Sequence, residues 1–305
     1  MVNVLLLAMF LMASSDLASP TPASVAPAVA GQTPQPAHEP PAEAEPPTDE
    51  PATDGPPADG AAVSDSAAVS DSAAVVEILD RMEAAGRDVR TIRCRIIYHV
   101  ADTLNLTETE KSGPILFKRA EPNPMFMVEF NRIGIDGILI AYKEWWLFRD
   151  RWLVEAKEKS ETIIKREVVE PGERTDFFDL EQSNIPMPFG QRREQILENF
   201  VVRLVPPQLG DPKGCDHLYC APKPDSPLAD DYRRLDYFVS RDIHLPLRIV
   251  AEDASGNKVT RADFPDLTEK SINVDLPDST FHLPKETDSY HVSEEPLGSQ
   301  APATP

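Results

Sequence analysis

The sequence predicts a mainly β protein (α+β), an incomplete antiparallel β-barrel of about 10–11 strands, with an N-terminal helix and a helical insertion forming a lid. Three observations predict this fold. Apolar and polar residues alternate in many short runs, which is the period of a half-buried strand. The runs recur at regular spacing, as in a sheet that curls. Only two segments show a helical period, and they are the available cover for an apolar sheet face.

The N-terminal part of the chain is not expected to fold. Val4–Ala13 is an apolar run of about half the ~20 residues that cross a bilayer, and a small-residue stretch follows it. Residues 1–15 are therefore predicted to be a secretory signal peptide. Residues 16–72 are rich in Pro, Ala and acidic side chains, which predicts a disordered, extended linker. We therefore expect an exported, periplasmic protein.

The folded domain is expected to begin with a helix over Ala73–Ala85. Ser72 suits its N-cap and Gly86 its C-terminus. The apolar residues of this segment fall on one face, which predicts packing against a sheet. A helical insertion interrupts the strands farther along, and its expected parts are a helix, a Pro-rich loop and a second helix at Thr175–Gln182, Ile185–Gly190 and Gln191–Phe200.

Strands are expected wherever the apolar period is two. In Thr91–Val100 every second residue is apolar, so one face of this strand is expected to be wet. The other predicted runs are Thr109–Arg119, Met125–Phe130, Ile138–Tyr142, Trp145–Phe148, Arg151–Ala156, Thr162–Val169, Val201–Val205, His217–Ala221, Arg234–Val239, Leu247–Glu252, Lys258–Phe264 and Thr280–Leu283. The domain is expected to span residues 73–292, with a disordered tail over 293–305.

Several of these segments together resemble one known family. The order of TIRCRIIYHV, SGPILFKR, LPLRIVAEDASGNKVT and INVDLPDSTFHLPKE after the first helix resembles the LolA-type outer-membrane lipoprotein carriers, over nearly all of residues 73–292. The resemblance implies a lipid-binding half-barrel closed by helices that carries lipoprotein acyl chains or free lipids through the periplasm. It further implies a membrane-bound donor complex and an acceptor as partners. We expect a monomer.

A carrier of this kind needs an apolar cavity, because each exposed methylene of an acyl chain costs ~0.8 kcal/mol in water. The cavity is expected to contain no charge. Its wall is predicted from apolar side chains of the early strands, namely Ile92, Ile96, Tyr98, Phe117, Met125, Met127, Trp145 and Trp146. The alternative is that these faces form an ordinary core.

Arg119 is the one polar member of the predicted ligand-binding site. It shares the strand phase of Ile115 and Phe117, and the resemblance implies that a basic residue at this position latches the lid. Such an arginine could donate hydrogen bonds to the free carbonyls at the end of a lid helix. The alternative is a surface arginine at a strand end. Lys143-Glu144, before Trp145, stand where the family has an Asp-Gly turn.

Other functional classes find little support in the sequence. The formal charge is −21, which repels phosphate backbones, so we expect no nucleic-acid partner. No motif of a hydrolase, metalloprotease or phosphate-binding loop occurs, so the chain is expected not to be an enzyme and to need no cofactor. Cys215, His217 and Cys220 would alternate in direction along a strand, so no metal site is predicted. A Cys215–Cys220 disulfide stays open, and Cys94 is expected to be a small core residue.

The sequence therefore predicts a periplasmic carrier that binds lipoprotein acyl chains, or other lipids, in a hydrophobic cavity and moves them between membranes. The alternative is an envelope sensor or protein-interaction module built on the same lidded half-barrel, which the acidic linker would hold at a distance from another structure.

Overall fold

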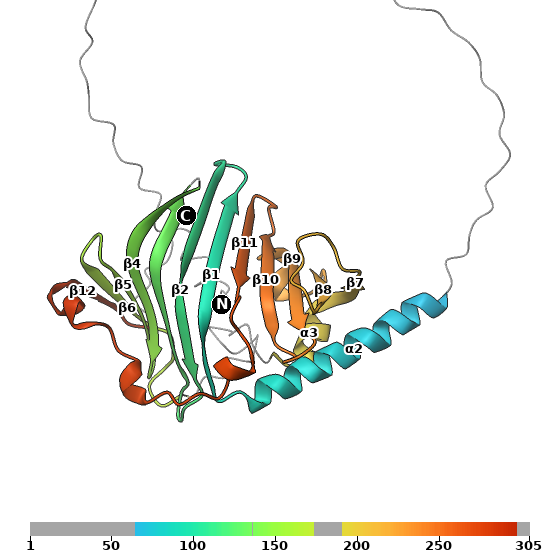
Figure 1. Cartoon of the computed structure of the whole chain (residues 1–305), viewed down its shortest axis with the longest axis horizontal. Helices are drawn as coiled ribbons and strands as arrows, with labels where there is room; N and C mark the ends of the chain where they lie inside the picture. The colour runs from blue at the N-terminus through green and yellow to red at the C-terminus, as the bar shows by residue number, and fades with distance from the viewer. Residues whose placement is uncertain (1–64, 136, 174–190, 298–305) are drawn as a thin grey trace, which may run out of the picture.

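The structure is a computed structural model that describes residues 65–135, 137–173 and 191–297 (Figure 1). Its main feature is one twelve-stranded sheet with two α-helices beside it. The helices are α2 (Asp65–Asp88) and α3 (Arg193–Asn199). The strands are β1 (Thr91–Asp102), β2 (Thr107–Lys118), β3 (Met125–Ile135), β4 (Ile138–Arg149), β5 (Trp152–Lys157), β6 (Thr162–Glu167), β7 (Phe200–Val205), β8 (Cys215–Pro222), β9 (Tyr232–Ser240), β10 (Pro246–Asp253), β11 (Lys258–Asp263) and β12 (His291–Glu295).

The sheet is open, with strand order β12-β6-β5-β4-β3-β2-β1-β11-β10-β9-β8-β7. All neighbours are antiparallel except β12 and β6, which pair in parallel. The end strands β12 and β7 do not pair with each other, so the sheet does not close into a barrel. This confirms the predicted fold class, an incomplete antiparallel barrel with an N-terminal helix.

The main differences from the prediction concern the first helix, strand β4 and the C-terminal segment. Helix α2 starts at Asp65, inside the segment expected to be linker. The two runs predicted at residues 138–148 form the single strand β4. The run predicted as a last strand, Thr280–Leu283, is not a strand: it begins inside the short 3-10 helix Asp278–Thr280 and continues as irregular chain. The last strand is β12, which extends into the expected tail. The predicted helix at 175–182 and the loop at 185–190 lie outside the described residues.

Period-two alternation divides the side chains of the sheet between two faces. We call inner the face on which α2 and α3 pack. Its buried members run across the sheet from β4 to β8, and they include Trp146, Phe130, Phe117, Tyr98, Ile249, Tyr237 and Leu218. The opposite face is called outer. Both faces carry buried apolar clusters, but different segments of the chain cover them.

Helix α2 covers the β7–β10 half of the inner face because its apolar side chains lie on one side. Val75, Ile78, Leu79 and Met82 are all buried there, in one cluster with residues of α3 and β7–β10. Farther along the helix, Ala85 packs against the neighbouring cluster on β1–β5. The C-terminal end of α2 thus reaches the other half of the inner face.

On the outer face, the C-terminal segment covers the β3–β6 half. Leu276 and Phe281 are fully buried there, against Met125 and Trp145. Three short 3-10 helices, Glu269–Ser271, Asp278–Thr280 and Lys285–Ser289, shape this segment before it ends in β12. Strands β3–β5 are therefore buried on both faces, which explains their near-continuous apolar sequences.

The tips of two neighbouring hairpins expose large aliphatic side chains. Leu104 and Leu106 belong to the β1–β2 turn, and Ile138, Leu139 and Ile140 begin β4 at the β3–β4 turn; their exposed fractions are between 50% and 86%. No helix in the described part of the chain is both long and apolar enough to span a bilayer.

Candidate ligand-binding face

The inner face of β1–β5 brings together five of the predicted site residues. Ile92, Ile96, Tyr98, Phe117 and Trp146 belong to one buried cluster. Each is less than 5% exposed. Burial also raises the pKa of the Tyr98 phenol, so its hydroxyl stays neutral. Together with Phe126, Val128 and Phe130 of β3, these side chains of β1, β2 and β4 form a continuous apolar surface that is closed to solvent in this structure.

Three predicted site residues lie on the other side of the sheet. Met125, Met127 and Trp145 belong to the outer-face cluster under the C-terminal segment. They do not contribute to the inner face, because residues one apart on a strand point to opposite faces. Trp145 and Trp146 are neighbours, so they could not both have lined one cavity.

Arg119 contacts the end of α2, as a latch would require. Its Nη2 donates a hydrogen bond to the carbonyl oxygen of Gly86, 3.0 Å away, in the last turn of the helix. The last carbonyls of a helix lack intrahelical donors and carry the negative end of the helix dipole, so a guanidinium group stabilises them. The side chain is exposed, however, and does not point into an apolar hollow. Arg119 joins the end of β2 to the end of α2 at the surface.

A buried ion pair interrupts the apolar inner face. The Nζ of Lys111 lies 2.8 Å from Oε2 of Glu144, and the two side chains are 4% and 0% exposed. Glu144 also accepts hydrogen bonds from the Tyr142 hydroxyl and from Nε1 of Trp146. The ammonium group of Lys111 lies 5.3 Å from the centroid of the Tyr142 ring. The Glu144 carboxylate is therefore neutralised by Lys111 and hydrogen-bonded by its neighbours, as a buried charge requires.

A second buried carboxylate follows on the next strand. Glu155 pairs with Trp146 across β4 and β5, and its side chain is 3% exposed. The Nζ of Lys157 lies 2.8 Å from Oε1 of Glu155, and Nη1 of Arg166 lies 3.1 Å from Oε2. The expectation of an uncharged inner face was thus wrong. We call Lys111, Tyr142, Glu144, Glu155, Lys157 and Arg166 the polar cluster.

The polar cluster could not be recognised from sequence periodicity, because charged residues in a strand usually face solvent. The only signal was local. Lys143 and Glu144 directly precede the Trp145-Trp146 pair, and β4 runs through all four residues without a break.

The cysteines support neither a metal site nor a disulfide. Cys94, Cys215 and Cys220 are all free and buried. Burial raises the pKa of the Cys94 thiol to about 12 and, with Asp216 nearby, that of Cys215 to about 11. His217 lies 3.1 Å from Asp236, as part of a side-chain network on the outer face. Among the described residues, no three potential metal-ligating side chains form a group.

Comparison with known proteins yields structural similarities only. No protein-family model matches the chain. No curated protein sequence matches it either. An uncharacterized conserved protein from Thermus thermophilus is similar, with 12% identity and a TM-score of 0.42 over 73% of this chain and 99% of that chain.

Two further solved structures are similar at the same low level. The MucA/MucB complex of Pseudomonas aeruginosa gives 14% identity and a TM-score of 0.40, over 70% of this chain and 62% of that chain. A LolA superfamily protein from Nitrosomonas europaea gives 14% identity and a TM-score of 0.30, over 68% of this chain and 96% of that chain. With TM-scores this low, conclusions about the site rest on the chain's own geometry: an open, helix-covered sheet with an apolar inner face.

Proposed function

We propose that the chain is a periplasmic carrier that holds acyl chains of lipoproteins or free lipids against its inner face. One observation supports this most directly. The inner face is apolar over most of the width of the sheet, and on its β7–β10 half the cover is a separate amphipathic helix. A helix that packs by one side can move away without breaking the sheet that it covers.

The energies of lid opening and acyl binding are of the same size. Removing α2 from the sheet exposes Val75, Ile78, Leu79 and Met82, at a cost of roughly 6–12 kcal/mol. Burying a chain of about 16 carbons returns about 12 kcal/mol at ~0.8 kcal/mol per methylene. Acyl binding can therefore offset the displacement of the helix. In this proposal the described structure is the closed state, since the inner face is buried.

The polar cluster gives the bound lipid a direction in this proposal. Acyl chains would lie along the apolar inner face from β10, which the displaced helix uncovers, to β3, and the ester or amide groups would lie toward Glu144 and Glu155. Tyr142 is half-buried, so its ring lies at the boundary between the polar cluster and solvent, with the hydroxyl turned to Glu144. Ester carbonyls need donors, and the hydroxyl and ammonium groups of this cluster are of that kind.

The two adjacent tryptophans provide a direct test. A stearic acid with a nitroxide on its chain quenches tryptophan at short range. We expect saturable quenching in a variant that retains only Trp146 (Trp145→Phe, Trp152→Phe). A matched variant that retains only Trp145 (Trp146→Phe, Trp152→Phe) should be quenched much less, because Trp145 lies on the outer face. Equal quenching of both, or no saturable quenching, would contradict the proposal.

Arg119 tests the movement of the lid. We expect Arg119→Leu to take up the acyl probe faster, with an unchanged far-UV dichroism spectrum, because the contact with Gly86 is lost. Arg149→Leu is the matched control, since Arg149 donates a hydrogen bond to the Phe281 carbonyl on the outer face, 3.2 Å away. If the two variants take up the probe at the same rate, the latch has no role.

A second candidate function is a protein-interaction module on the same fold. The observation that favours it is the exposure of aliphatic side chains, among them Leu106 and Leu139, at the tips of two neighbouring hairpins. Under this alternative, Ile138→Ser/Leu139→Ser would abolish recovery of a stoichiometric partner from the envelope and leave acyl-probe binding unchanged. Under the carrier proposal, probe binding to the inner face persists whether or not a partner is recovered.

A further inference from the structure

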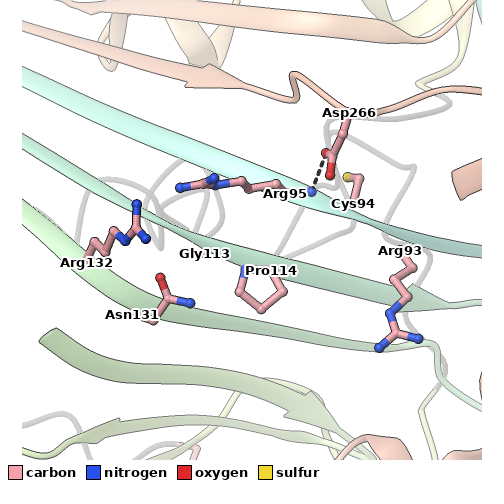
Figure 2. Close-up of a pocket in the computed structure, with 8 residues that line it drawn as sticks. All are labelled: Arg93, Cys94, Arg95, Gly113, Pro114, Asn131, Arg132 and Asp266. Atoms are coloured by element: carbon pink, nitrogen blue, oxygen red, sulfur yellow. Dashed lines mark hydrogen bonds between the residues drawn. The ribbon is translucent and has the colours of Figure 1, made fainter. Parts of the chain in front are cut away.

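The outer face carries a groove of about 470 Å³ on β1–β3, on the opposite side of these strands from the inner face (Figure 2). Three arginine side chains surround it: Arg93 and Arg95 from β1, and Arg132 from β3. Figure 2 shows them arrayed around Gly113 and Pro114, with Arg95 and Arg132 toward one end and Arg93 at the other. All three are exposed.

A break in strand register creates the groove. The pairing of β2 with β3 shifts between Ser112 and Ile115, and the backbones approach closely at Gly113. A Cβ atom at Gly113 would lie 1.7 Å from the carbonyl oxygen of Glu129, so only glycine fits there. Pro114 follows, in a position where an interior strand tolerates proline only at an irregularity. The groove is therefore a built feature of the fold.

The arginines of the groove lack the partners that other outer-face arginines have. Arg234, Arg248 and Arg261 each form an ion pair with a carboxylate on their own or the next strand. Among the described residues, no ion pair involves the three arginines of the groove. The one carboxylate in the lining, Asp266, accepts a hydrogen bond from the backbone N–H of Arg95, 2.6 Å away.

Arg95 Nη2 donates a hydrogen bond to the Ser112 hydroxyl, 3.3 Å away, which leaves its charge without a counter-ion within the described ranges of the chain. The groove thus gathers three cations on a chain of net charge −21. Such a groove attracts an anionic ligand, and the guanidinium fork is suited to carboxylates and phosphates. The cations are spread along the groove and do not converge on one point (Figure 2). This arrangement favours an extended ligand with several spaced carboxylates over a single phosphate group.

We propose that the arginine groove binds an acidic peptide segment, and that its occupant is residues 39–59 of this chain. This segment holds seven acidic residues and no Lys or Arg. In an extended chain, carboxylates two residues apart, such as Glu43 and Glu45, are ~7 Å apart on one side. Arg93 and Arg95 have the same separation on β1, so the two rows of charge match.

The segment can reach the groove from the start of α2. The 24 residues of α2 are ~36 Å long at 1.5 Å per residue. The helix ends two residues before β1, which carries Arg93 and Arg95. The chain between Glu50 and Asp65 spans up to ~50 Å when extended. Because α2 packs on the inner face and the groove lies on the outer face, the segment has to run back along α2 and pass round the sheet at the start of β1. The 20 residues from Glu45 to Asp65 span up to ~66 Å when extended, which is enough to place Glu43 and Glu45 in the groove.

The test uses the full chain with a nitroxide label on Ala52→Cys. The native thiols react slowly because burial raises their pKa, so the label enters selectively. The readout is paramagnetic broadening of the backbone amides of Gly113, Asn131 and Asp266. We expect broadening at low salt, and its loss at ~1 M NaCl, where the Debye length falls to about 3 Å. Broadening should also be lost in the triple variant Arg93→Gln/Arg95→Gln/Arg132→Gln.

A matched variant controls for net charge. Lys165→Gln/Arg233→Gln/Arg241→Gln removes the same three charges away from the groove and should keep the broadening. Loss of the paramagnetic broadening in the variant Glu43→Gln/Glu45→Gln/Asp49→Asn/Glu50→Gln would identify the acidic partners of the arginines. Unbroadened groove amides, or equal broadening in both arginine variants, would overturn the proposal. So would groove amides that shift only with inorganic phosphate or phosphatidylglycerol vesicles, since the ligand would then be a phosphate.

Discussion

Removing either member of the Lys111–Glu144 pair should destabilise the fold severely, whereas removing both should cost little. In Lys111→Met the Glu144 carboxylate, 0% exposed, loses its cation, and in Glu144→Met the ammonium group of Lys111, 4% exposed, loses its anion. Breaking a buried ion pair in this way costs ~3–5 kcal/mol. If the two changes acted independently, the double variant would lose ~6–10 kcal/mol.

The double variant Lys111→Met/Glu144→Met leaves no uncompensated charge. Its main cost is the Nε1–H of Trp146, which loses its acceptor inside the sheet, at ~1–3 kcal/mol. We therefore expect a coupling free energy of several kcal/mol between the two sites.

The assay is urea unfolding at pH 7, followed by tryptophan fluorescence and by far-UV dichroism. Lys165→Met is the control, because Lys165 and its partner Glu294 are 37% and 55% exposed, and such a pair contributes less than about 1 kcal/mol. The reasoning is refuted if Lys111→Met is as stable as the unmodified chain, or if the losses of the two single variants add.

Three further predictions concern backbone packing and ionisation. Gly113→Ala should cost about 3 kcal/mol or more, since a Cβ would meet the Glu129 carbonyl oxygen at 1.7 Å. Gly137→Ala, with open space but φ +82, should cost ~1 kcal/mol by the same urea assay, and equal losses would be inconsistent with the close approach. Iodoacetamide at pH 8 should modify Cys94 and Cys215 only after denaturation, because their thiol pKa values are raised to about 12 and about 11. Mass spectrometry of the intact protein measures the modification, and rapid alkylation of the native protein would disprove the prediction. These folded-state pKa values exceed the ordinary 9.0, so the thiols of the unfolded chain ionise at lower pH than those of the folded protein. The stability that the neutral thiols contribute is therefore complete below pH 9 and is lost between pH 9 and about 12. A urea midpoint that rises over this pH range would contradict the assignment.

Strand positions were predictable where one face of the sheet is covered and the other is wet. In β1, alternation places Ile92, Ile96 and Tyr98 on the inner face and Arg93 and Arg95 on the outer face, as the structure shows. The covering helix was also readable from its apolar face. Its start at Asp65 was not, because Ser72 offers a good N-cap that the helix does not use.

Face assignment failed in β3 and β4 for a physical reason. Both sides of these strands are buried, so Met125–Val128 and Trp145–Phe148 are continuous apolar runs without a phase. The residues that cover their outer face, Leu276 and Phe281, are distant in sequence. The polar cluster was missed for a related reason, since Lys111 and Glu144 become compatible with burial only after β2, β3 and β4 have paired.

The parallel pairing of β12 with β6 determines where the chain can be shortened. Lys165 and Arg166 of β6 form ion pairs with Glu294 and Glu295 of β12, so the last strand adds charge to that end of the sheet. A chain cut after Tyr290 would leave the backbone donors and acceptors of β6 open to another molecule, the arrangement from which edge-to-edge aggregation starts. Expression trials should therefore retain residues 291–295 and attach any affinity tag beyond them.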